Sequence, residues 1–72
     1  MKAVEKKVKK IMTGLLVSSL GQPLASIIVN TILDDVLEEM RHTMGEIGED
    51  DVNAESVKSR MGKVLERLLY DL

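Results

Sequence analysis

The feature that most constrains the fold is an uncharged stretch of twenty-three residues, Ile11 to Leu33, which reads IMTGLLVSSLGQPLASIIVNTIL. A membrane-spanning helix needs about 20 predominantly apolar residues, so the length alone would allow a span. However, ten of these residues are Thr, Gly, Ser, Gln, Pro or Asn, and Gly21-Gln22-Pro23 interrupts the stretch in the middle. We therefore interpret it as the end of a helical hairpin in a cytoplasmic protein without a membrane partner. A weak membrane span and a secretory signal sequence are the alternatives.

The spacing of apolar residues predicts one helix before the break and one after it. Val4, Val8, Ile11 and Leu15 recur every three or four residues and form one helical stripe. Glycine can end a helix, and proline suits the first turn of the next one. After the break, apolar side chains cover most of the circumference in the first half of the second predicted helix. We expect that half to be packed on more than one side.

A third helix is predicted after an acidic turn. The second predicted helix should end near Gly45 or Gly48, and Asn53 is a favourable N-cap with Glu55 in the following turn. Helical spacing then continues to the C-terminus through Val57, Met61, Val64, Leu65, Leu68 and Leu69. The sequence therefore predicts an all-α protein, a single domain of residues 1–72 in which a long hairpin is followed by a C-terminal amphipathic helix.

The small size of the chain favours self-association. A chain of 72 residues buries only a small core, and it has no cysteine for a disulfide. We expect an intertwined or bundled homo-oligomer. The predicted interface comprises apolar residues of the hairpin: Ile11, Leu15, Leu16, Leu20, Leu24, Ile27, Ile28, Ile32, Leu33, Met40 and Met44. Flexible methionine side chains would also let Met40 and Met44 accept a helix of a partner protein.

Charge is distributed in three blocks. Residues 1–20 carry five lysines and one glutamate (+4), residues 21–56 nine acids and one arginine (−8), and residues 57–72 four bases and two acids (+2). The blocks could complement each other within or between chains, or the basic ones could contact nucleic acid. The candidates for such a contact are Lys6, Lys7, Lys9, Lys10, Arg60, Lys63 and Arg67. Tyr70 is the only aromatic residue, which disfavours stacking on single-stranded bases.

Catalytic and metal-binding patterns are weak. The chain has no cysteine and a single histidine, His42, so a nucleophilic triad is not expected. Glu39 and His42 have the Glu-x-x-His spacing of di-metal sites in helical bundles, but Glu55 and Glu66 fall on the polar side of the third predicted helix. We therefore predict no enzyme activity, no cofactor and no metal, with His42 solvated or ion-paired.

The C-terminal third, DVNAESVKSRMGKVLERLLYDL, resembles the last loop and helix of histone-fold proteins of the small centromere protein X type. The resemblance implies a DNA-associated dimer. It stops at the preceding hairpin, because the first loop of that fold is longer and basic, whereas only Gly21-Gln22-Pro23 separates the first two predicted helices.

The sequence thus leaves two functional hypotheses. The first is a small protein–protein interaction or regulatory module that acts as a homodimer or larger bundle. The second is a DNA-associated helical dimer that uses the basic residues of the first and third predicted helices.

Overall fold

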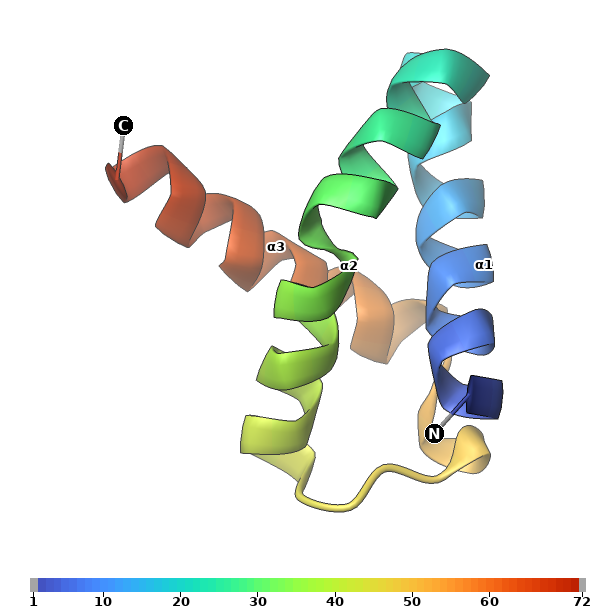
Figure 1. Ribbon diagram of the computed structural model, residues 1–72, viewed down its shortest axis with the longest axis vertical. Helices are drawn as coiled ribbons and strands as arrows, with labels where there is room; N and C mark the ends of the chain where they lie inside the picture. Colours follow the sequence, from blue (N-terminus) through green and yellow to red (C-terminus); the bar gives the residue numbers. More distant parts are fainter. Residues whose placement is uncertain (1, 72) are drawn as a thin grey trace.

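The computed structural model describes residues 2–71, and within that range it contains three α-helices, one short 3-10 helix and no strand. The elements are α1 (Lys2–Leu20), α2 (Gln22–Met44), η1 (Glu49–Asp51) and α3 (Ala54–Asp71). Helices α1 and α2 form a long hairpin, and α3 crosses it with its C-terminal end projecting away (Figure 1). The predicted all-α, three-helix architecture is confirmed. Met1 and Leu72, which the predicted domain includes, lie outside the described residues.

A single residue, Gly21, joins the two helices of the hairpin. Its N–H donates to the carbonyl of Val17 at 3.0 Å and closes α1, while its own carbonyl accepts from the N–H of Ala25 at 3.1 Å and opens α2. The backbone at Gly21 has φ 83° and ψ 166°, a region that only glycine adopts readily. The predicted break is thus correct but shorter than expected, because Gln22 and Pro23 already belong to the first turn of α2.

The segment between α2 and α3 is anchored to the rest of the chain. Helix α2 ends at Met44, and the N–H of Gly45, at φ 74°, donates to the carbonyl of Arg41 at 2.8 Å. Beyond it, Ile47 and Val52 are buried in the core, on either side of η1. The acidic turn was therefore predicted correctly in position, but these two apolar contacts were missed.

Asn53 begins α3 as predicted. Its side-chain oxygen accepts from the N–H of Ser56 at 2.9 Å, and the hydroxyl of Ser56 accepts from the N–H of Asn53 at 3.1 Å. This reciprocal pair satisfies two backbone donors at the start of the helix. The cap therefore fixes the residue at which α3 starts.

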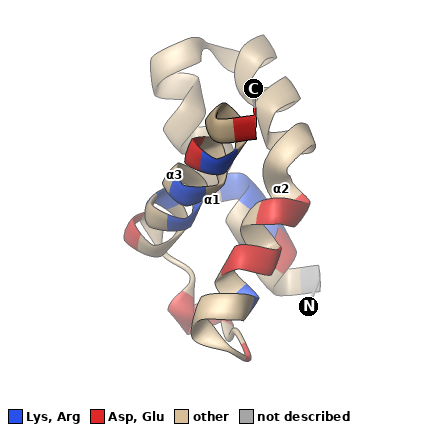
Figure 2. Ribbon diagram, turned by 90° about the vertical axis from the view of Figure 1, so that its left-hand side faces the viewer, with Lys and Arg blue, Asp and Glu red and all other residues tan. Residues whose placement is uncertain are grey.

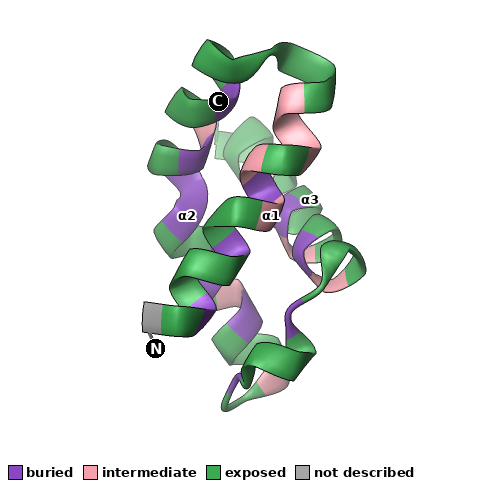
Figure 3. Ribbon diagram, turned by 90° about the vertical axis from the view of Figure 1, so that its right-hand side faces the viewer, coloured by how far each residue is buried: buried purple, intermediate pink, exposed green. Residues whose placement is uncertain are grey.

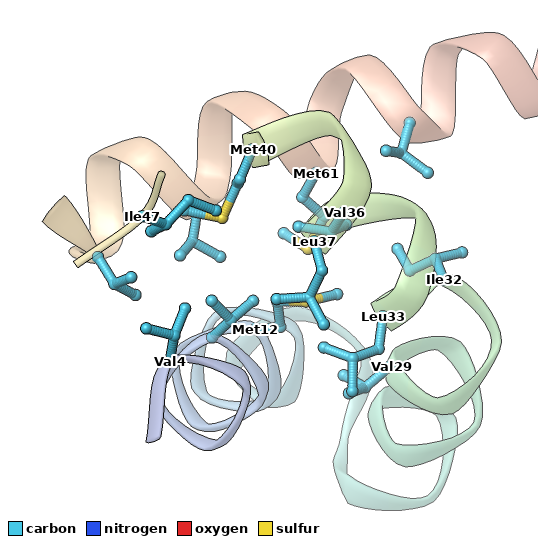
Figure 4. Close-up of a cluster of buried hydrophobic side chains, with 14 residues drawn as sticks. Val4, Met12, Val29, Ile32, Leu33, Val36, Leu37, Met40, Ile47 and Met61 are labelled. Atoms are coloured by element: carbon cyan, nitrogen blue, oxygen red, sulfur yellow. The ribbon is translucent and has the colours of Figure 1, made fainter. Parts of the chain in front are cut away.

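The core is aliphatic and draws on all three α-helices (Figure 4). Met12 of α1 and Met40 of α2 are its largest fully buried side chains, and no polar side chain among the described residues is buried with them. The buried cluster comprises Val4, Val8, Met12, Val29, Ile32, Leu33, Val36, Leu37, Met40, Ile47, Val52, Val57, Met61 and Val64. Packing of α3 against both hairpin helices closes this cluster.

Candidate functional site

Six large apolar side chains of the described chain are exposed, and they lie at the ends of two elements. Leu20, Leu24 and Ile27 surround the turn between α1 and α2, and we call them the hairpin-end group. Leu68, Leu69 and Tyr70 occupy the last turn of α3 and form the α3-end group. Four of the six are more than half exposed: Leu24 at 53%, Ile27 at 62%, Leu69 at 71% and Tyr70 at 84%.

The hairpin-end group belongs to a part of the molecule without charge. No charged residue occurs between Ile11 and Leu33, and the end of the hairpin is accordingly free of blue and red in Figure 2. Figure 3 shows that the same end is exposed on its outer side. Leu24 and Ile27 belong to the half of α2 that was predicted to pack on more than one side, and within the chain they are left uncovered.

The α3-end group is exposed because α3 extends past the hairpin. Val57, Met61 and Val64 of α3 are buried, whereas Leu68, which follows Val64 on the same side of the helix, is 40% exposed. Figure 1 shows α2 and the C-terminal part of α3 diverging from their crossing point. On this side, the last turn of α3 is therefore left uncovered by the rest of residues 2–71.

The eleven residues of the predicted interface take three different positions. Three are buried within the single chain: Ile32, Leu33 and Met40. Five are half-buried against the core: Ile11, Leu15, Leu16, Ile28 and Met44. Leu20, Leu24 and Ile27 are exposed. The predicted interface did not include the α3-end group. Tyr70, the only aromatic residue of the sequence, is the signal that could have pointed to it.

The predicted nucleic-acid contacts are spread over two helices and partly engaged within the chain. Arg67 forms an ion pair with Glu39 at 2.7 Å, the kind of contact expected if the basic residues of α3 serve the fold. The ammonium group of Lys7 donates to the carbonyl of Glu49 at 2.7 Å, and Arg60 is half-buried. Lys6, Lys9, Lys10 and Lys63 are exposed, with no ion pair inside residues 2–71.

An open pocket of about 440 Å³ lies between α2 and α3, on the side where the two helices diverge. Its lining residues are Asp35, Glu38, Glu39, His42, Val64, Arg67, Leu68 and Asp71. Both members of the Glu39–His42 pair lie here, and the carboxylate of Glu39 is held by Arg67. Among the described residues, no group of three or more potential ligands is arranged to hold a metal ion. The pocket is thus a largely acidic recess that reaches the α3-end group at Leu68.

Two further observations bear on the class of protein. Nowhere in residues 2–71 does a helix combine the length and the apolar character that crossing a membrane requires. Comparison of the chain with protein-family models, with curated proteins and with solved structures found no match. The resemblance to histone-fold proteins therefore rests on residues 51–72 alone.

Proposed function

We propose that this protein is a small helical interaction module that acts as a homodimer and associates through its exposed apolar ends. The observation that carries the proposal is the exposure of the hairpin-end group on an uncharged part of the molecule. Large apolar side chains that gather on a surface mark interaction sites. An uncharged end also brings no like charges together when two copies meet, so a second copy is a suitable partner.

The exposed area supports association as well. The chain exposes 5075 Å², whereas a folded monomer of its mass, 8.0 kDa, is expected to expose about 4,450 Å². The difference of roughly 600 Å² approaches the roughly 800 Å² that each partner contributes to a standard protein interface. A second copy that covers the exposed apolar ends would remove most of this excess.

The first test is a charge placed in the hairpin-end group. Ile27→Asp is expected to weaken the dimer about tenfold or more, because a carboxylate in an apolar interface loses its hydration without gaining a partner. Ala3→Asp is the control, since Ala3 is an exposed residue in the first turn of α1, at the end of the hairpin opposite to Gly21. Sedimentation velocity over a concentration series measures both variants against the wild type. A wild type that remains an 8.0 kDa monomer at micromolar concentration would refute the proposal.

The exposed lysines of α1 favour the DNA-associated alternative, and a second variant tests it. We expect no duplex binding by the wild type, because the acidic central part of the chain opposes contact with phosphates. In the variant, Lys6, Lys9 and Lys10 are changed to glutamine, while Lys7 and its hydrogen bond to Glu49 are kept. We expect neither the wild type nor this variant to shift a DNA duplex in an electrophoretic mobility assay. Sub-micromolar, salt-sensitive binding that the variant loses would instead establish the alternative, with about one counterion released per phosphate contact.

A further inference from the structure

We infer that, in the dimer, the segment of α2 from Leu24 to Asp34 in one copy packs antiparallel to the C-terminal half of α3 in the other copy, and that this contact occurs twice. The inference rests on the proposed homodimer and specifies its interface. It is drawn from two matching rows of exposed side chains, one on each helix.

The row on α2 runs from apolar to acidic. Leu24, Ile27 and Asp34 are all exposed and are separated by three and seven residues. Such spacings place them on one side of a helix. The row on α3 runs from basic to apolar, because Lys63 and Tyr70 are exposed and also seven residues apart.

The two rows match in length and in chemistry only when the helices are antiparallel. Seven residues of helix span about 10.5 Å, so the distance along the axis is the same from Ile27 to Asp34 as from Tyr70 to Lys63. Setting Ile27 against Tyr70 therefore brings Asp34 to Lys63, apolar against apolar and acid against base. With parallel helices, Ile27 would instead meet Lys63 and Asp34 would meet Tyr70.

A second copy is the partner that this match identifies. Among the described side chains of residues 3–71, Arg67 pairs with Glu39, whereas Asp34 and Lys63 have no charged partner. The C-terminal end of α3 projects away from the hairpin, so the two rows do not meet in one chain (Figure 1). Each chain carries one row on α2 and one row on α3. In a dimer with a two-fold axis, the α2 row of each copy contacts the α3 row of the other copy. All four rows are then paired, and no row is left over to bind a third copy.

Cysteine cross-linking tests the pairing directly, because the natural chain has no cysteine. Ile27→Cys and Tyr70→Cys are prepared as separate proteins, mixed, and exposed to a mild oxidant. A disulfide forms when two Cβ atoms come to about 3.5–4.5 Å, so we expect a cross-linked dimer in the mixture and little in either protein alone. Cross-linking of Ile27→Cys with itself alone would show that the hairpin ends meet each other and would overturn the inference.

Charge exchange provides an independent test at exposed positions that leave the core intact. Asp34→Lys and Lys63→Asp are each expected to weaken the dimer about fivefold, and the double variant should recover most of that loss. Sedimentation velocity measures dimer dissociation, and circular dichroism checks that helix content is kept. Additive losses in the double variant would overturn the pairing while leaving the homodimer standing. A monomeric wild type would overturn both.

Discussion

Replacing Val36 with aspartate is expected to abolish cooperative thermal unfolding of this chain. Val36 lies in α2 with 0% of its surface exposed, in a core that contains no polar side chain among the described residues. An unpaired carboxylate at such a site costs several kcal/mol. A chain of this length has a total stability of about 4–11 kcal/mol, so one substitution of this kind removes much or all of it.

The control for this variant is Asn30→Asp, which adds a carboxylate to an exposed site on the same helix. Surface changes of this kind usually alter the free energy of unfolding by less than about 0.5 kcal/mol. Circular dichroism at 222 nm, followed through a thermal ramp, measures both variants. A cooperative transition of Val36→Asp near that of the wild type would show that α2 does not pack through this side.

Gly21→Ala is expected to destabilise the hairpin by about 1–3 kcal/mol, although nothing lies within 4 Å of the added Cβ. The cost is purely conformational, because φ 83° with ψ 166° is a backbone state that an L side chain rarely adopts. Moving Gly21 out of that state would break either its bond to Val17 or the one to Ala25. The one-residue connection between α1 and α2 therefore depends on glycine.

Gly14→Ala is the matched variant and should have the opposite sign. Gly14 also has open space around its Cβ position, but it lies in the interior of α1, where alanine is favoured over glycine by about 0.5–1 kcal/mol. The midpoints of urea-induced unfolding should therefore move in opposite directions for the two variants. Equal stabilisation by both would mean that residue 21 can adopt an ordinary helical or extended conformation in the folded chain.

The uncharged stretch from Ile11 to Leu33 serves both the core and the surface. Met12 and Val29 are fully buried, while Leu20, Leu24 and Ile27 remain outside. A chain of this size can enclose only part of its apolar side chains. The part that it leaves outside is the basis of the proposed dimer, and the absence of charge over the same residues keeps the hairpin end free of repulsion between copies.

The sequence by itself determined the features that depend on neighbouring residues. Helical periodicity before and after Gly21 predicted the two hairpin helices, and glycine and proline chemistry located the break. Asn53 was identified as the N-cap of α3 because its side chain acts within its own turn. Each of these signals operates over a few residues, so each can be read without knowing where the rest of the chain lies.

Only the tertiary structure decided which apolar side chains are enclosed. Met40 and Leu69 both lie on apolar stripes of their helices, yet Met40 is fully buried and Leu69 is 71% exposed. The difference arises from the crossing of α3 over the hairpin, which leaves its last turn beyond α2 (Figure 1). The ion pair of Arg67 with Glu39 across twenty-eight residues follows from the same crossing. Periodicity specifies which side of a helix is apolar, but how much of that side is covered depends on contacts between residues far apart in the sequence.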